Sequence, residues 1–332
     1  MTGRLGPAIA RAAALLVRAQ DVTLLAHVNP DADSLGSALA LGIALRRRGA
    51  VVRVSFAAPE QMPETLVPLD VLGLVVPPEE VPRAPELLVA CDAAERSRLG
   101  ELAGRLATAK ASIMIDHHAT NPGFGDVQVL DPAAEATVVL VRQVLAAMAV
   151  PLDADIARCL YAGLVTDTSG FRRADASAHL LAAELVSAGV DPEALVRPLM
   201  DTHPFAWLDA LGRILQSAVL EPDAANGLGL VYACVPLADT TRFRTEEVDG
   251  VVDVLRTAEE AEVAAVLKQV GVRRFTASLR STGRVDVAAA ARMLGGGGHR
   301  AAAGFTRDGS VDDVLTALRT ALAAVPPQAL AS

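Results

Sequence analysis

Short aliphatic runs and longer helix-like segments alternate through the first half of this chain, and this alternation limits the folds that it can adopt. A short aliphatic run bounded by turn residues fits a buried strand, whereas apolar residues at every third or fourth position fit a helix. Strands that alternate with helices build a parallel sheet with helices on both faces. We therefore predict an α/β fold with strands at residues 23–26, 51–56, 87–91 and 112–115. Helices are expected at residues 9–19, 34–48, 136–148, 153–164 and 175–188.

The length of 332 residues suits two domains, since a single domain usually has about 100 to 200 residues. In the second half, an aliphatic strand and a helix precede an antiparallel hairpin at residues 262–270 and 273–280, and two more helices follow. We predict a parallel-sheet domain at 1–192, a helical linker at 193–221, a smaller α/β domain at 222–325 and a tail at 326–332. The active site is expected in the cleft between the two domains.

Composition restricts the partners of the chain. Its net charge is −9, and its arginines are scattered rather than clustered. Long duplex DNA or RNA is bound through many phosphate contacts from a basic surface, so this chain is a poor candidate for it. Lys110 and Lys268 are the only lysines among 30 basic residues, and arginine is the better cation for gripping phosphate through a planar fork. Any nucleic-acid ligand should therefore be short.

Cysteine usage and hydropathy indicate a cytoplasmic protein. Cys91, Cys159 and Cys234 lie far apart beside aliphatic residues, as expected of buried, reduced thiols. No run of apolar residues reaches the length of a membrane span, so we expect no membrane association. The chain is expected to act as a monomer or as a homodimer.

Residues 27–37 read His-Val-Asn-Pro-Asp-Ala-Asp-Ser-Leu-Gly-Ser and place an imidazole and two carboxylates at a strand-to-helix turn. A helix cap at Asp33 or Ser34 and a turn at Asp31 are the ordinary uses of such residues. A cap explains one carboxylate, but it does not explain two carboxylates together with His27. This density of charge favours a cation site.

Further polar clusters follow other predicted elements. Asp92 ends the third strand, Asp116-His117-His118 end the fourth, and Asp167 lies in a Thr-Asp-Thr-Ser-Gly segment. Each cluster alone fits an ordinary loop. Ligands of parallel sheets bind beyond the carboxyl ends of the strands, however, so the clusters should converge at one edge. Carboxylate and imidazole ligands without thiolates suit Mn²⁺ better than structural zinc.

These four motifs, in this order, resemble the DHH phosphoesterase superfamily. Residues 295–305, Gly-Gly-Gly-Gly-His-Arg-Ala-Ala-Ala-Gly-Phe, resemble the signature of the first type of DHH-associated domain. The resemblance covers nearly the whole chain. Within the superfamily, the sequence is most similar to the nanoRNase and pAp phosphatase group, which includes cyclic-di-AMP phosphodiesterases. RecJ-type exonucleases are normally longer, and family II pyrophosphatases lack the Gly-Gly-Gly-His run.

The resemblance implies two divalent metal ions, most readily Mn²⁺. The ligands that it implies are His27, Asp31, Asp33, Asp92, His117 and Asp167. Asp92 would bridge the two ions, Asp167 would complete the first site with His27 and Asp31, and the second site would hold Asp33 and His117. The four negative charges of the carboxylates would balance the four positive charges of two divalent ions.

The resemblance also implies residues that act on the substrate. His118 would face it as an acid or as a phosphate donor, and Asp116 would orient an imidazole. The substrate-binding residues that it implies in the second domain are Arg280, Gly297, Gly298 and His299. A glycine run is usually a flexible turn, but its backbone can also approach a phosphate closely, and a helix starting after it would add a favourable dipole. Ser169 stands where the family commonly has glycine.

The function expected from these residues is Mn²⁺-dependent hydrolysis of short oligoribonucleotides or small nucleotides to 5′-mononucleotides, as in a nanoRNase or pAp phosphatase. Hydrolysis of cyclic-di-AMP is the alternative within the same fold. The non-enzyme alternative is a nucleotide-binding module, which the complete set of ligands disfavours.

Overall fold

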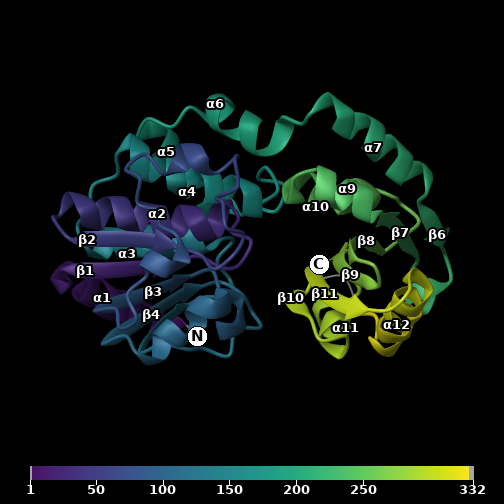
Figure 1. Cartoon of the computed structure of the whole chain (residues 1–332), viewed down its shortest axis with the longest axis horizontal. Helices are drawn as coiled ribbons and strands as arrows, with labels where there is room; N and C mark the ends of the chain where they lie inside the picture. The colour runs from purple at the N-terminus through teal and green to yellow at the C-terminus, as the bar shows by residue number, and fades with distance from the viewer. Residues whose placement is uncertain (1, 329–332) are drawn as a thin grey trace. The chain divides into compact units, whose positions relative to one another are not determined.

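The structure is a computed structural model that describes residues 2–328, and it divides into two compact units between Thr202 and His203. Figure 1 follows the chain from the first unit into the second. Among the residues described, no helix is both long enough and apolar enough to cross a membrane.

A five-stranded parallel sheet forms the centre of the first unit, with the strand order β2-β1-β3-β4-β5. Its strands are β1 (Asp21–Leu25), β2 (Val51–Ser55), β3 (Leu87–Cys91), β4 (Ala111–Asp116) and β5 (Val127–Leu130). The predicted α/β fold and parallel sheet are confirmed. β5 was not predicted, because its Val-Gln-Val-Leu sequence is only four residues long and is interrupted by Gln128.

The α-helices of the first unit share one hydrophobic core with one face of this sheet. They are α1 (Thr2–Arg18), α2 (Ala32–Arg47), α3 (Thr137–Ala147), α4 (Ala154–Asp167), α5 (Ala176–Ser187) and α6 (Pro192–Val196). Strand residues that point to the other face, such as Leu88 and Met114, pack instead against Leu99 and Leu102 of a 3₁₀ segment (Arg96–Ala107). The second face is therefore covered by 3₁₀ structure, where α-helices were expected. Shorter 3₁₀ turns lie at Val67–Leu69 and Pro78–Glu80, and a π turn follows α6 at Arg197–Asp201.

The second unit is built on a six-stranded mixed sheet with the order β10-β11-β9-β8-β7-β6. Its strands are β6 (Val219–Glu221), β7 (Leu230–Val235), β8 (Val263–Gly271), β9 (Arg274–Ser281), β10 (Gly297–His299) and β11 (Ala302–Asp308). The predicted antiparallel hairpin is β8 and β9. No helix starts after the glycine run, because the chain continues through β10 and β11 instead.

Two cores hold helices on opposite faces of this sheet. One face packs against α11 (Val287–Met293) and α12 (Val311–Ala324), and the other against α7 (Phe205–Gln216) and α10 (Thr245–Leu255). Trp207 of α7 is buried in the second of these cores. The remaining helices are α8 (Ala224–Gly227) and α9 (Leu237–Arg242).

Candidate metal centre

The first motif lies where β1 passes into α2. Asp31 is the N-cap of α2, and its Oδ1 accepts a hydrogen bond of 2.9 Å from the backbone N–H of Ser34. Its Oδ2 lies 3.4 Å from Nε2 of His27. The cap is thus Asp31 and not Asp33 or Ser34, and a single carboxylate both starts the helix and faces the imidazole.

His27, Asp31 and Asp92 form one of the groups in the described part of the chain whose donor atoms lie close enough together to hold a metal ion. Nε2 of His27 lies 3.5 Å from Oδ2 of Asp92. Nδ1 of His27 lies 3.0 Å from the carbonyl oxygen of Val28. A neutral His27 that carries its proton on Nδ1 would donate it to this carbonyl and would leave the lone pair of Nε2 for a metal ion.

The second group contains Asp33, Asp92 and His117. Nε2 of His117 lies 3.6 Å from Oδ1 of Asp92 and 3.9 Å from Oδ2 of Asp33. Nδ1 of His117 lies 3.0 Å from the carbonyl oxygen of Ala134, so this imidazole also offers Nε2 to the site. Oδ2 of Asp167 lies 3.3 Å from the same Nε2, which brings Asp167 beside the second group.

Asp92 belongs to both groups because its two oxygens face different imidazoles, Oδ2 toward His27 and Oδ1 toward His117. Its backbone φ of 56° lies in the left-handed region that non-glycine residues seldom adopt. A hydrogen bond of 2.9 Å to the carbonyl of Ile115 holds the Asp92 N–H in this conformation. Such backbone strain is typical of functional positions.

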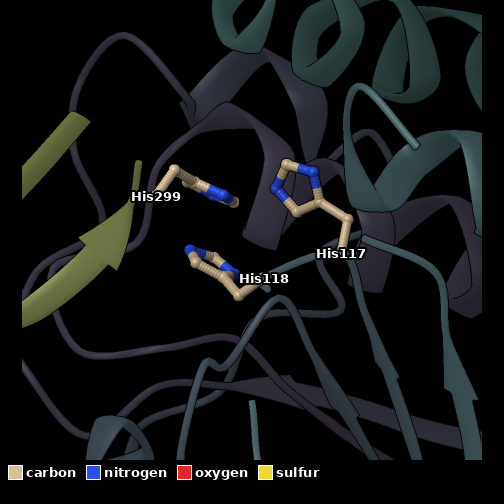
Figure 2. Close-up of side chains that lie close together, drawn as sticks. All are labelled: His117, His118 and His299. Carbon is tan, nitrogen blue, oxygen red and sulfur yellow. The ribbon is translucent and has the colours of Figure 1, made fainter. Parts of the chain in front are cut away.

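His118 and Asp116 form a pair that also reaches Asp92, whose Oδ1 lies 3.6 Å from Nδ1 of His118. Nδ1 of His118 lies 2.7 Å from Oδ1 of Asp116, and the His117 and His118 rings meet edge to face with centroids 5.0 Å apart (Figure 2). Asp116 is fully buried, whereas the side chain of His118 is 20% exposed. The pair thus combines an anchored carboxylate with an imidazole that solvent can reach.

Electrostatics favour a cation at these groups. Burial opposes a charged imidazole, yet the carboxylates of Asp31 and Asp92 raise the pKa of His27 to about 10. Burial also opposes protonation of His117, but Asp167, Asp33 and Asp92 raise its pKa to about 11. Burial and the nearby negative charges raise the pKa of Asp33 well above its ordinary value. Without a metal ion the cluster therefore gathers protons, and its hard oxygen and imidazole donors fit divalent cations that can replace them.

Sequence analysis misses three residues that contact the site. Nη2 of Arg98 lies 3.2 Å from Nδ1 of His27. Asn121 donates hydrogen bonds to Oδ2 of Asp116 at 2.5 Å and to the carbonyl of Ala93 at 3.0 Å. Thr137 contacts two of the aspartates, as described below. No local motif marks any of the three, although Asn121 follows the Asp-His-His motif closely.

In the second unit, three neighbouring strands align the predicted substrate-binding residues. Arg280 of β9 pairs in register with Ala302 of β11, which pairs in turn with His299 of β10. Residues in register share a face of the sheet, so Arg280 and His299 lie on either side of the small Ala302. Their backbone positions are two strand spacings, or about 10 Å, apart. Nε of Arg280 lies 3.7 Å from Oδ1 of Asp253.

The glycine run has a packing role. A Cβ on Gly296 would lie 2.0 Å from the carbonyl oxygen of Gly304, and one on Gly298 would lie 2.6 Å from that of Ala302. Gly298 also has a φ of 134°, which favours glycine. Glycine is therefore required at these two positions for β10 to approach β11. A Cβ on Gly297, in contrast, would meet no atom within 4 Å in the described part of the chain.

Comparison with known proteins agrees with this architecture. The sequence profile of the DHH family, N-terminal domain, matches residues 21–164, and that of the DHHA1 domain matches residues 228–324. The bifunctional oligoribonuclease and PAP phosphatase NrnA of Thermus thermophilus is 33% identical over 310 residues, which cover 91% of this chain and 90% of that protein. The cyclic-di-AMP phosphodiesterase GdpP of Geobacillus thermodenitrificans is 26% identical, over 93% of this chain and 48% of its own.

The fold also has a solved counterpart. An exopolyphosphatase-related protein from Bacteroides fragilis superposes with a TM-score of 0.83 and 22% identity, covering 96% of both chains. A parallel sheet followed by a mixed-sheet unit is thus a fold that this chain shares with that solved protein. The chain belongs to the DHH family and carries a DHHA1 domain, which confirms the resemblance found in the sequence.

Proposed function

We propose that this protein is a Mn²⁺-dependent phosphoesterase that hydrolyses short oligoribonucleotides or small nucleotides such as pAp. The observation that carries the proposal is the pair of His/Asp groups that share Asp92. The similarity to an oligoribonuclease and PAP phosphatase over nine tenths of both chains supports the substrate class.

Two divalent ions would occupy the two groups. Both sites would use Asp92, while the other ligands divide into His27 and Asp31 for the first site and Asp33, His117 and Asp167 for the second. The resemblance implied that Asp167 completes the first site, but we assign it to the second because its Oδ2 lies 3.3 Å from Nε2 of His117. Mn²⁺ suits a set of hard oxygen ligands mixed with imidazole. When bound, such a pair of ions supplies an activated water for attack on phosphorus and neutralises charge on the phosphate.

The residues around the ligands hold them in orientation. The carbonyls of Val28 and Ala134 keep the Nδ1 protons of His27 and His117, and so present both Nε2 atoms to the site. His118 is placed to donate a proton or a hydrogen bond to the phosphate of the substrate. Asp116 holds Nδ1 of His118, and the side-chain amide of Asn121 holds Asp116 in turn.

The second unit supplies the substrate grip. A guanidinium binds phosphate through two parallel hydrogen bonds, so Arg280 is suited to an anionic group of the ligand, with His299 on the same face of the sheet. Gly297, whose Cβ direction is open, and Gly298 complete the proposed binding surface.

We assign the enzyme to the cytoplasm, where its free cysteines Cys91, Cys159 and Cys234 would stay reduced.

A substrate panel tests the proposal. Purified protein, stripped with chelator and reloaded with Mn²⁺ or Zn²⁺, is assayed on pAp, on cyclic-di-AMP and on 5′-labelled oligoribonucleotides from dinucleotides to about twenty nucleotides. We expect activity only after reloading, higher with Mn²⁺, and a kcat/KM that falls steeply beyond a few nucleotides. Undiminished hydrolysis in excess chelator, or equal efficiency on all lengths, would contradict the proposal. Preference for cyclic-di-AMP would favour the function named for the Geobacillus relative.

Arg280→Ala and a matched control test the grip on the substrate. We expect Arg280→Ala to lower kcat/KM about 10- to 100-fold with the Mn²⁺ content unchanged, since a hydrogen bond to a charged group contributes about 1.5 to 3 kcal/mol. Arg274→Ala removes an exposed arginine at the other end of β9. This arginine pairs with Asp308. It should leave kcat/KM unchanged, and an equal loss in both variants would argue against a specific role for Arg280.

A further inference from the structure

Thr137, the first residue of α3, contacts an aspartate from each of two other segments. Its backbone N–H donates a hydrogen bond of 2.7 Å to Oδ2 of Asp33, and its Oγ1 donates one of 2.8 Å to Oδ1 of Asp92. The backbone N–H of Val138 donates a bond of 2.9 Å to Oδ1 of Asp33. Thr137 is fully buried, so water does not compete for these bonds.

The start of α3 explains the contact with Asp33. The first N–H groups of a helix have no partner within it, and the N-cap residue Ala136 has no side chain that could accept their hydrogen bonds. The carboxylate of Asp33, from α2, takes the place of that cap. The partial positive charge of the helix N-terminus favours this arrangement.

The hydroxyl of Thr137 acts on the aspartate that both metal groups share. By donating to Oδ1 of Asp92, it holds the carboxylate rotated so that Oδ2 remains toward His27 and Oδ1 toward His117. Thr137 is fully buried, and the packing around its side chain keeps the donor in place.

We propose that Thr137 is a positioning residue that fixes Asp92 relative to Asp33 and thereby sets the geometry shared by the two metal sites. Its backbone holds a ligand of the second site alone, while its hydroxyl holds the ligand common to both. The inference rests on the proposed function insofar as the two groups bind metal. Hydrogen bonds to metal ligands orient them, and the loss of such a bond typically costs 10- to 100-fold in metal affinity or activity.

Three substitutions test the proposal. Thr137→Val keeps the shape and removes the hydroxyl, whereas Thr137→Ser keeps the hydroxyl. Thr23→Val is the matched control, because Thr23 is equally buried in β1 and its hydroxyl has no hydrogen-bond partner among the described residues. Mn²⁺ affinity is measured by calorimetry, and the coupling of the two ions by electron paramagnetic resonance, both without substrate.

We expect Thr137→Val to bind Mn²⁺ about 10- to 100-fold more weakly and to lose the spectrum of a coupled ion pair. Thr137→Ser should stay within a few-fold of wild type, and Thr23→Val should match it. Wild-type affinity and spectrum in Thr137→Val would overturn the proposal, as would an equal loss in Thr23→Val. If Thr137→Val does not fold in chelator, Thr137→Ala, which suits a helix start, takes its place in the same comparison.

The same measurements separate this proposal from the proposed function. If the wild-type protein binds no pair of Mn²⁺ ions or hydrolyses no phosphoester of the panel, the proposed function fails. If the wild type does both and Thr137→Val behaves identically to it, the role of Thr137 alone fails.

Discussion

Gly163→Ala should damage the metal centre from inside α4, although Gly163 is not a ligand. A Cβ at this position would lie 2.7 Å from Cγ1 of Val138, 2.8 Å from Oδ1 of Asp33 and 2.9 Å from Cα of Asp33. Carbon atoms in favourable contact lie about 3.5 to 4.0 Å apart, so α4 and α2 could not keep their present approach. The backbone and carboxylate of Asp33 would have to move, and with them the cap of α3.

The expected magnitude combines two opposing terms. Overpacking a well-packed core costs about 1 to 3 kcal/mol, whereas replacing glycine by alanine inside a helix contributes about 0.5 to 1 kcal/mol of stability. The net loss should be roughly 0.5 to 2 kcal/mol in the metal-free protein. If Asp33 is a ligand as proposed, its displacement should lower Mn²⁺ affinity by at least about 10-fold.

Denaturant titration in chelator, followed by Mn²⁺ calorimetry, checks both effects. The control is Gly212→Ala on α7 of the second unit, where a Cβ meets no atom of the described residues within 4 Å. At Gly212 only the stabilisation of the helix by alanine applies. We therefore expect the free energy of unfolding to rise by about 0.5 to 1 kcal/mol, with Mn²⁺ affinity unchanged. If Gly163→Ala is stabilised as Gly212→Ala is, and binds Mn²⁺ normally, the steric reasoning is wrong.

Three further predictions concern single carboxylates. Asp92→Asn should lower turnover by more than about 100-fold with the circular dichroism spectrum unchanged, because a ligand contributes more than the residues that orient it; near-normal rates would refute its shared position. Asp116→Asn should lower kcat about 10- to 100-fold and leave Mn²⁺ content intact, since it loosens His118; unchanged kcat would count against the pair. Glu262 accepts hydrogen bonds from the Gly283 and Arg284 N–H groups. Burial opposes ionisation of Glu262, but nearby hydroxyl donors and these N–H groups lower its pKa below the ordinary value of 4.5. The stabilisation that the Glu262 carboxylate gives the fold is therefore present above pH 4.5 and is lost on acidification. The stability difference between wild type and Glu262→Gln in denaturant titrations should thus shrink as pH falls below 4.5, and a constant difference would contradict this.

The local sequence by itself determined the fold class and most of the candidate site. A buried parallel strand is a continuous aliphatic run, so the strand at residues 87–91 was predictable from a few consecutive residues. The order of strands and helices implied a parallel sheet, and the polar clusters at the strand ends then indicated where ligands would gather. The Asp-His-His motif and residues 27–37 carried the family resemblance because each is a short run of consecutive residues.

The tertiary structure alone decided how these residues act together. Thr137 meets Asp33 across 104 positions of sequence, and β5 is a strand because β4 offers it an edge to pair with. The left-handed backbone of Asp92 is likewise held by a hydrogen bond that its N–H donates to the carbonyl of Ile115 on the neighbouring strand. Periodicity and composition describe which face of a segment is buried, but not which distant atom it meets there. Hydrogen bonds and packing between remote segments depend on three-dimensional distances, and these are set only when the whole unit folds.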